Sequence, residues 1–365
     1  MSPSGGAPKG LYGQNIARKL AGKAGELVAH DSQLQQSLAD AIHKVLGDEK
    51  AATPAAGPVY ANPDLTIDKK AVDSLTFTDK SLYGDSGEPS QNDVFQKGGI
   101  GFGDCWFASA MGATAMQEPD IIKNAIQYDP KTQSFNVSLY DVPQDFSSTR
   151  DSAALASAKR TINIGQDELK YDIEQAGGSG VVYSKPDGSF GVNPKAAVWP
   201  AVMEAAYGKM RYGSVQAGVG EFYSGGIAGG TPDAGLKSIT GHSGVERTAQ
   251  QVTYNDLATA LANHQPVELG TTSSSGPNIE DDFKDGLCHN HAYTVTGVDH
   301  AANGDTLVTV RNPWGANYVY DSAGTHAYMP VAGDPDPRNA YYTFDLDQVN
   351  KDSVVDGFSI GTRSQ

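Results

Sequence analysis

The spacing of apolar residues changes near the middle of the chain, and this change limits the folds open to it. Residues 105–127 and 199–210 carry apolar residues at helical spacing, so we expect helices there. Strand-like runs predominate after Gly241 and predict strands at residues 267–269, 291–298, 306–310 and 341–346, after an earlier one at 135–139. This order predicts an α+β protein with a helical lobe over residues 60–240 and a β lobe over residues 241–365. A cleft between two lobes is the natural place for a functional site.

The first 59 residues differ in character from the rest. Residues 14–46 have apolar residues three and four positions apart, with a break at Asp31-Ser32, so we expect two short helices. Residues 50–59 are rich in Ala, Pro and Gly, the composition of a linker. We therefore expect residues 1–59 to form a helical extension and linker, with helices 14–46 acting as a regulatory or targeting arm that binds a partner.

Charge and composition exclude several classes of function. The chain has 365 residues, and 27 Lys and Arg against 43 Asp and Glu give a formal net charge of −16 at pH 7. Nucleic acids and anionic membranes attract clustered Lys and Arg, so neither is an expected partner. No apolar run reaches the ~18 residues of a membrane-spanning helix, and the start of the chain lacks the layout of a cleaved export signal. We expect no membrane insertion, and a protein that is cytoplasmic or exported without a cleaved signal peptide. Two cysteines make no disulfide framework.

A glycine-rich stretch that leads directly into a predicted helix is the most informative local sequence. It reads GGIGFGDCW over residues 98–106 and places Cys105 at the helix start. The positive end of the helix dipole and the N–H groups there favour a thiolate, the nucleophilic form. The stretch lacks the Gly-Lys-Ser/Thr ending of a phosphate-binding loop. Two interpretations of Cys105 remain open, a nucleophile or a buried structural cysteine.

A nucleophilic cysteine needs a base, and His291 is the candidate. His291 opens the predicted strand 291–298, which places it at the edge of the β lobe. The next strand leads into Asn312, whose side chain is suited to accept a hydrogen bond from the imidazole and hold its tautomer. Trp314 follows, where its ring can shield that bond from water. Cys, His and Asn together form a thiol-protease triad, provided that Cys105 and His291 meet across the cleft.

Three motifs resemble the cysteine-protease core of the calpains. They are Gly103-Asp104-Cys105-Trp106, the run HAYTVTG at residues 291–297, and Arg311-Asn312-Pro313-Trp314-Gly315. The helix sequence WPAVMEAAYGK at 199–209 and the segments 225–241 and 344–349 resemble the same family, so the resemblance covers about residues 75–363. It implies a papain-like two-lobed fold, with Cys105 on the helical lobe and His291 and Asn312 on a β-barrel-like lobe. It also implies endopeptidase activity on proteins or peptides. Residues 1–59 resemble no calpain module, and we expect the regulatory domains of typical calpains to be absent.

The resemblance also implies a role for each site residue. The Cys105 thiolate attacks the peptide carbonyl, His291 forms the ion pair with it and protonates the leaving amine, and Asn312 orients His291. Gly103 and Trp314 support the site. We expect the Asp104 carboxylate to face structural hydrogen bonds, because a carboxylate aimed at the sulfur would raise the thiol pKa.

The glutamine of the family's oxyanion hole is displaced in this sequence. Calpains carry it six residues before the cysteine, where this chain has Gly99. The run Asp93-Val94-Phe95-Gln96 resembles the family sequence around that glutamine. We therefore expect Gln96 to aim its side-chain amide at the site, with a glycine-rich loop three residues longer after it.

We expect no required cofactor. Calpains place an acidic calcium ligand two positions before the helix tryptophan, and this chain has Ala197 there. Asp93 matches another calcium ligand of the family. Calcium prefers six to eight oxygen ligands, so one carboxylate makes a poor site, and we expect calcium to act as a regulator if it binds at all. Cys288, His289 and His291 are close in sequence, yet neighbours in a strand point to opposite faces, so we expect no metal site from them.

Two other functions remain open from the sequence. Transglutaminases also combine a Gly-x-Cys-Trp nucleophile with a histidine, but their third member is Asp where this chain has Asn312. A protease-like binding module without turnover is favoured by the altered spacing of Gln96. The intact Cys, His and Asn set argues against it.

Overall fold

Apolar side chains gather in two hydrophobic cores in the computed structural model of the chain. One core is built by residues between Val72 and Ile239, and the other by residues between Ala249 and Ile360. The structure describes residues 68–96, 103–144, 158–175, 178–184, 190–219, 226–272, 283–284, 286–315, 317–320, 326–328 and 340–363. Residues 65–365 belong to one compact unit. The expected helices at 14–46 and the linker at 50–59 lie outside the described residues.

The first core is surrounded by helices and one small sheet. The helices are α3 (Lys69–Asp73), α4 (Asp79–Leu82), α5 (Cys105–Gln117), α6 (Pro119–Ala125), α7 (Gln166–Gln175), α8 (Trp199–Tyr212), α9 (Val215–Val219) and α10 (Pro232–Thr240), with short 3-10 turns at Gly84–Ser86 and Gln91–Asp93. Strands β1 (Ile126–Asp129), β2 (Ser134–Tyr140) and β3 (Lys159–Ile164) form an antiparallel sheet, and β4 (Val182–Ser184) pairs with β5 (Phe190–Val192). Proline in the first turn begins α6, α8 and α10, where its missing N–H costs no helical hydrogen bond.

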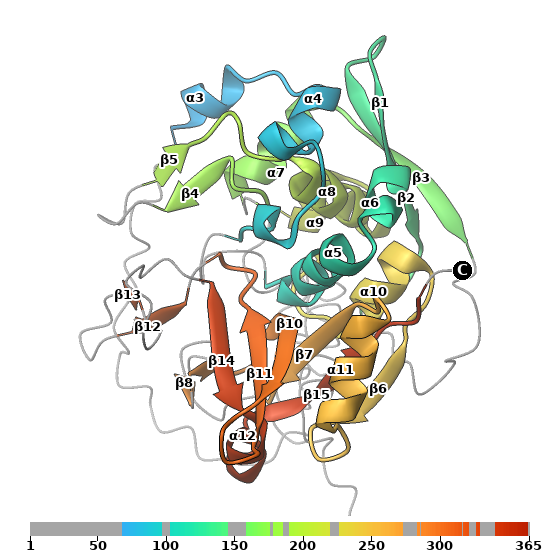
Figure 1. The fold of residues 1–365 in the computed structure, drawn as a ribbon. Helices are drawn as coiled ribbons and strands as arrows, with labels where there is room; N and C mark the ends of the chain where they lie inside the picture. Colours follow the sequence, from blue (N-terminus) through green and yellow to red (C-terminus); the bar gives the residue numbers. More distant parts are fainter. Residues whose placement is uncertain are drawn as a thin grey trace, which may run out of the picture. The chain divides into compact units, whose positions relative to one another are not determined.

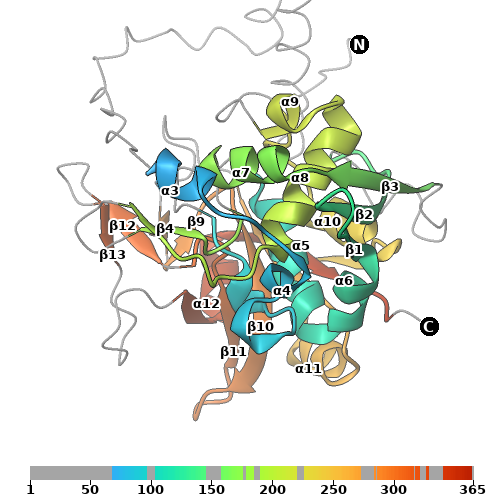
Figure 2. The same ribbon diagram turned by 90° about the horizontal axis from the view of Figure 1, so that it is seen from above.

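Helix α8 is buried on nearly all sides. Figures 1 and 2 both show it between α7 on one side and β2 and β3 on the other, and it also contacts α5 and α9. Its sequence explains this position, because small residues such as Ala201, Ala205 and Gly208 let neighbouring backbones approach closely. A polar residue in the middle of this helix, Glu204, is therefore enclosed with the apolar ones.

The second core packs around a six-stranded antiparallel sheet. Its strand order is β14 (Tyr341–Asp345), β11 (Thr306–Arg311), β10 (Ala292–His300), β7 (Val267–Thr271), β15 (Val355–Ile360) and β6 (Val245–Thr248). Helices α11 (Tyr254–Ala262) and α12 (Leu346–Asp352) belong to this part, as do the short pairs β8 (Phe283–Lys284) with β9 (Leu287–Cys288) and β12 (Tyr318–Tyr320) with β13 (His326–Tyr328). β7 is buried along its whole length because it contacts α5, α10 and α11.

Helix α5 joins the two cores. Figure 1 shows it between α8 and the six-stranded sheet, where it contacts β10 and β7. Thr294 Oγ1 on β10 donates to the carbonyl of Ser109 on α5 at 2.9 Å. Gly112 leaves room for this contact, since a Cβ there would lie 2.6 Å from Thr294 Oγ1. The helix that begins with Cys105 is thus held against the strand that follows His291.

The structure confirms the mixed α+β composition and corrects two details. The helix expected to reach residue 127 ends at Ala125, because β1 begins at Ile126. The expected β-barrel-like lobe is not closed among the described strands, since β14 and β6 stand at the two edges of the six-stranded order. In the described part of the chain, no helix has both the length and the apolar character needed to cross a membrane.

Candidate active site

Cys105 is the first residue of α5, and the backbone before it makes a tight turn. Gly103 has a φ of +68°, which residues with a Cβ rarely adopt, and its carbonyl accepts a hydrogen bond from the Gly229 N–H at 2.9 Å. The first N–H groups of an α-helix have no acceptor within the helix and give this end a partial positive charge. Cys105 is 8 % exposed. Its side chain is therefore nearly buried at a position that stabilises negative charge.

Trp106 anchors this end of the helix in the first core. Its Nε1 donates to the carbonyl of Ile227 at 3.1 Å, and its ring meets Tyr207 edge-on with centroids 5.3 Å apart. Helix α10 packs closely here because it has Gly235, where a Cβ would lie 2.6 Å from the Trp106 carbonyl oxygen. This packing fixes the position of the cysteine that precedes it.

His291 and Asn312 lie together at one end of β10 and β11. His291 Nε2 is 2.9 Å from Asn312 Oδ1, and both residues are buried. Trp314 covers this pair, with its ring centroid 4.4 Å from that of His291. The Asn312 amide nitrogen donates to Asn317 Oδ1 at 3.4 Å. Asn312, the residue expected to hold the imidazole, is therefore itself held at both ends of its side chain.

The hydrogen bonds around Asn312 determine which nitrogen of His291 carries a proton. The backbone N–H of Trp314 lies 3.0 Å from the same Asn312 atom as His291 Nε2 does. A backbone N–H can only donate, so that atom must be the oxygen of the amide. His291 Nε2 must then donate, which leaves Nδ1 as the proton-accepting nitrogen of a neutral ring.

Burial sets the charge of His291. It lowers the pKa of His291 to about 4, although the hydrogen bond to Asn312 acts in the opposite direction. The ring is therefore neutral at pH 7. Its buried Nδ1 makes no hydrogen bond to a nitrogen or oxygen of the described residues. This charge state does not favour the resting ion pair with Cys105 that the sequence led us to expect.

Gln96 lies between the residues around Cys105 and those around Asn312. Its backbone N–H donates to the carbonyl of Pro313 at 2.9 Å, and its side-chain Nε2 donates to Asp104 Oδ1. The side chain is buried. Gln96 thus bridges the residue before Cys105 and the residue after Asn312.

Comparison with known families gives a partial match. Residues 188–325 match the family described as calpain family cysteine protease. This segment therefore has the sequence of part of a calpain-family core. The matched residues include His291 and Asn312 and cover less than half of the chain, while Cys105 and Gln96 lie ahead of them. The match supports a cysteine peptidase. No curated protein matches the chain.

Asp104 has a side-chain partner, Gln96, that the sequence did not identify. Although Asp104 is at the N-cap of α5, its carboxylate makes no capping bond. It accepts from Gln96 Nε2, and this bond opposes the rise in the Asp104 pKa that burial causes. Asp104 and Glu204 are both completely buried. The expectation that Asp104 is engaged in structural hydrogen bonds agrees with this arrangement.

The two positions that align with calcium ligands of the calpains, Asp93 and Ala197, are poorly suited to bind calcium in this structure. Asp93 Oδ2 accepts from Trp199 Nε1 at 2.8 Å and from the Ser90 N–H at 2.8 Å. Ala197 has no side-chain oxygen. An indole and a backbone N–H therefore already occupy one oxygen of the only carboxylate that matches a family ligand, and no step of the chemistry is routed through calcium here.

Cys288 ends β9 and His289 lies in the turn that follows, so neither is in one continuous strand with His291. Asn290 has a φ of +55°, so the alternation of faces assumed for a strand does not apply. Cys288 N–H donates to Tyr293 Oη at 2.8 Å, and His289 Nδ1 is 3.0 Å from the carbonyl of Thr272. No group of three potential metal ligands occurs among the described residues.

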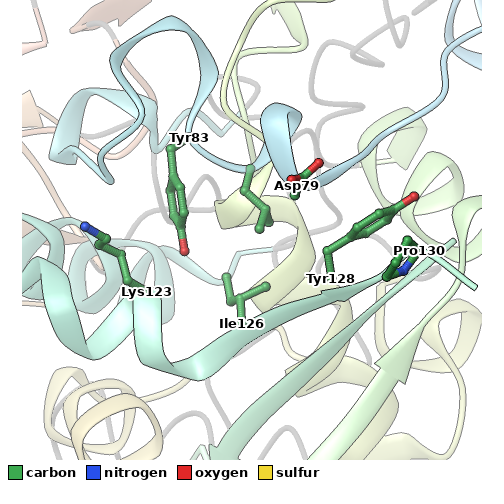
Figure 3. Close-up of a pocket in the computed structure, with 7 residues that line it drawn as sticks. Asp79, Tyr83, Lys123, Ile126, Tyr128 and Pro130 are labelled. Atoms are coloured by element: carbon green, nitrogen blue, oxygen red, sulfur yellow. The ribbon is translucent and has the colours of Figure 1, made fainter.

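A surface pocket of about 440 Å³ lies away from these residues, on the part of the chain that surrounds the first core. Figure 3 shows it between α4, α6 and β1, with Tyr83 and Tyr128 on either side of Ile126. Lys123 at its edge pairs with Glu88 at 2.8 Å. None of the predicted site residues lines this pocket, so it has no part in the chemistry considered below.

Proposed function

We propose that the chain is a cysteine endopeptidase that hydrolyses peptide bonds in protein substrates with Cys105, His291 and Asn312. The observation that carries this proposal is the bond from His291 Nε2 to Asn312 Oδ1, because it leaves Nδ1 able to take a proton from a thiol. The calpain-family match over His291 and Asn312 supports the same reaction class. A papain-like arrangement of a helical and a β part, meeting at α5, is part of this proposal.

Several contacts support a meeting of Cys105 and His291. Ser109 on α5 bonds Thr294, which is three residues after His291. Gln96 bonds both Asp104, the neighbour of Cys105, and Pro313, the neighbour of Asn312. These two links join the start of α5 to the His291 end of the sheet. We propose that the Cys105 thiol faces His291 Nδ1.

The proposed reaction proceeds by acyl transfer. The Cys105 thiol gives its proton to His291 Nδ1 as the sulfur attacks the carbonyl carbon of the peptide, which forms a tetrahedral oxyanion. The oxyanion collapses, the C–N bond breaks, and the imidazolium proton goes to the leaving amine. Water then attacks the thioester and gives a proton to His291, and the carboxylic acid product leaves as the thiol is restored. Proton transfer during the attack fits the neutral histidine better than a resting ion pair does.

The proposed oxyanion donors are the Cys105 backbone N–H and the Gln96 side chain. An amide nitrogen carries two hydrogens, and Asp104 accepts one of those on Gln96 Nε2. The second hydrogen is the one that we propose for the oxyanion. Such donors act where charge develops in the transition state, and the loss of one costs about 10²–10³ in rate.

We propose that this activity needs no cofactor and no calcium. The engaged Asp93 carboxylate and the side chain of Ala197 support this proposal. Calcium prefers six to eight oxygen ligands, and one carboxylate that already accepts two hydrogen bonds is a poor start for such a site. Calcium as a regulator is the alternative.

Hydrolysis of an unfolded protein such as casein tests the proposed function. We expect the wild-type chain to cleave casein, Cys105→Ala to be inactive, and Cys288→Ala to keep the wild-type rate as the matched cysteine control. An epoxide inhibitor of thiol proteases should label Cys105 in the wild type and fail to label it in His291→Ala. Labelling that persists in His291→Ala, with no cleavage by the wild type, would indicate a binding module. Incorporation of an added amine at glutamine residues without cleavage would indicate a transglutaminase-like enzyme.

A further inference from the structure

Arg311 is a buried cation at the end of β11, one residue before Asn312. Its Nε donates to Asn92 Oδ1 at 3.2 Å, and its Nη2 donates to the carbonyl oxygen of Val94 at 2.8 Å. Burial lowers the pKa of Arg311 to about 10, so the guanidinium remains positively charged at pH 7. A buried charge is costly unless hydrogen bonds replace its lost water. These two bonds tie β11 to the segment of residues 91–96.

Tyr341 on β14 binds the same segment. Its Oη donates to Asn92 Oδ1 at 2.7 Å and accepts from Gln91 Nε2 at 2.9 Å. Tyr341 lies opposite Arg311 in the pairing of β11 with β14. An arginine N–H can only donate, so the Asn92 atom that both residues contact is the amide oxygen. One oxygen of Asn92 therefore accepts from two neighbouring strands.

The other side of residues 91–96 is attached to the first core. Val94 is one of the buried residues of that core and forms an isolated bridge with Ser179. The Phe95 N–H donates to the Gly178 carbonyl at 3.2 Å. The segment thus lies between the two hydrophobic cores and is bonded to both.

Gln96 ends this segment and links it to the proposed catalytic groups. Its backbone N–H donates to the carbonyl of Pro313 at 2.9 Å, and its side-chain Nε2 donates to Asp104 Oδ1. The side chain of Arg311 and the backbone of Pro313 thus hold alternate residues of the segment, 92, 94 and 96. The position from which the Gln96 side chain extends is therefore set by the end of β11.

We propose that Arg311 positions the Gln96 amide for the oxyanion formed at Cys105, by holding residues 91–96 against β11. This inference rests on the proposed function, and Arg311 is a positioning residue because it acts through Gln96. A hydrogen bond from a charged donor is about twice as strong as one from a neutral donor, so the guanidinium holds the segment firmly. The proposed oxyanion donor and Asn312 are thereby fixed to the end of one strand.

The contacts of Tyr341 make Asn92 the sharper position for a test. The Tyr341 carbonyl accepts from Asn317 Nδ2 at 3.2 Å, and Asn317 Oδ1 accepts from Asn312 at 3.4 Å. A change at Tyr341 can therefore disturb Asn312 directly. The Asn92 side chain contacts the sheet through Arg311 and Tyr341, and the residue is exposed, so its substitution leaves the cores intact.

Asn92→Ala removes the oxygen that Arg311 binds. We expect kcat to fall about tenfold with KM unchanged, because the Gln96 donor is still present but loosely held, and its complete loss costs about 10²–10³. Asn92→Asp keeps an accepting oxygen beside the guanidinium and should retain the wild-type kcat. Asn303→Ala is the matched control, because Asn303 is also exposed and bonds Asp305 instead. An unchanged kcat in Asn92→Ala, or an equal loss in Asn92→Asp, would overturn the proposal.

Arg311→Lys tests the arginine itself. Lysine keeps the charge and the length of the side chain but not the two nitrogens that reach separate oxygens, so we expect the same loss of about tenfold in kcat. Arg160→Lys is the matched control, since Arg160 also bonds a backbone carbonyl, that of Met210, and should keep the wild-type kcat. A wild-type kcat in Arg311→Lys contradicts the proposal.

Two measurements separate positioning of Gln96 from a general loosening of the site. Alkylation of Cys105 by iodoacetamide forms no oxyanion, so its rate should not fall in Asn92→Ala. Gln96→Ala combined with Asn92→Ala should be no slower than Gln96→Ala alone, because Asn92 and Arg311 act through Gln96. Parallel losses of hydrolysis and alkylation, or additive losses in the double variant, would refute the role of Arg311.

Hydrogen exchange distinguishes a failure of this inference from a failure of the proposed function. The backbone N–H of Gln96 should exchange about tenfold faster in Asn92→Ala and Arg311→Lys than in the wild type or Asn92→Asp, because opening the segment no longer breaks the Arg311 bonds. If the wild type cleaves no peptide bond and exchange differs in this way, Arg311 holds the segment and the protease assignment fails. If the wild type is active and exchange is equal in all four proteins, the holding role is refuted while the protease assignment stands.

Discussion

His291 Nε2 donates to Asn312 Oδ1 at 2.9 Å, and the two residues are 21 positions apart at the ends of β10 and β11. The geometry of the antiparallel pair explains their meeting, because the register that joins Thr294 to Arg311 brings the residues just before β10 close to those just after β11. The sheet thus places the proposed base and its proposed orienting group together. We propose that helix α5 brings the Cys105 thiol to the same end.

Asn312→Ala should reduce turnover more than substrate binding. The alanine removes the acceptor for His291 Nε2, so the ring can rotate or adopt the wrong tautomer. A small misplacement of a catalytic group costs on the order of 10²-fold in rate, so we expect kcat to fall by about this factor with KM little changed. Steady-state hydrolysis of a peptide substrate measures both constants. Asn163→Ala, whose side chain bonds Ser134 and Asn136 on β2, is the control, and a wild-type kcat in Asn312→Ala would exclude the proposed role.

The buried neutral state of His291 predicts a pH dependence of stability. Because folding lowers the pKa of His291 from 6.5 to about 4, its contribution is fully present above about pH 6.5 and is lost as the pH falls through about 4. This loss amounts to about 3 kcal/mol in the free energy of unfolding. Denaturant unfolding at pH 4 and pH 7 should show the loss in the wild type and not in His291→Gln. His300→Gln, an exposed position on the same strand, is the control. A folded-state pKa above 6.5, measured by NMR titration of His291, would contradict the prediction and favour a resting ion pair.

Gly315 after Trp314 should tolerate no side chain. Its φ is +74°, and a Cβ would lie 2.0 Å from a ring carbon of Phe95. Gly87 has a similar φ of +70° with nothing within 4 Å, so Gly87→Ala measures the backbone strain alone. We expect Gly87→Ala to lower the free energy of unfolding by about 1 kcal/mol and Gly315→Ala by about 2–4 kcal/mol, since overpacking adds to the strain. Equal losses in the two variants would show that Phe95 moves aside without cost.

Local patterns predicted the elements that hold the proposed site. The apolar spacing of residues 105–117 and 199–210 matches α5 and α8, and the β-branched runs match β10 and β11. The hydrogen bond between His291 and Asn312 was also expected from the sequence. These features follow from spacing along one or two neighbouring elements, which a sequence displays directly.

Features that depend on several distant elements were not predicted. Glu204 stands in the middle of a helix, where a glutamate is ordinarily exposed, and it is buried because four other elements besides α5 enclose α8. Small residues such as Ala201, Ala205 and Gly208 in that helix were the available signal. Asn290 has a left-handed backbone conformation, so His289 does not lie in the strand that the sequence led us to assume. Whether the edge strands of a sheet pair to close a barrel cannot be predicted from the sequence of a single strand, and here β14 and β6 stay at the two edges.

Calcium should have no effect on hydrolysis by the wild-type chain. The Asp93 carboxylate already accepts from Trp199 and Ser90, and the alignment places Ala197 where a second acidic ligand is required. We therefore expect the same rate of casein cleavage in EGTA and in micromolar calcium, and the same independence in Asp93→Asn. Equal concentrations of magnesium serve as the control, because a net charge of −16 attracts divalent cations without a specific site. Activity that vanishes with EGTA and returns with calcium but not with magnesium would place a calcium site in this protein.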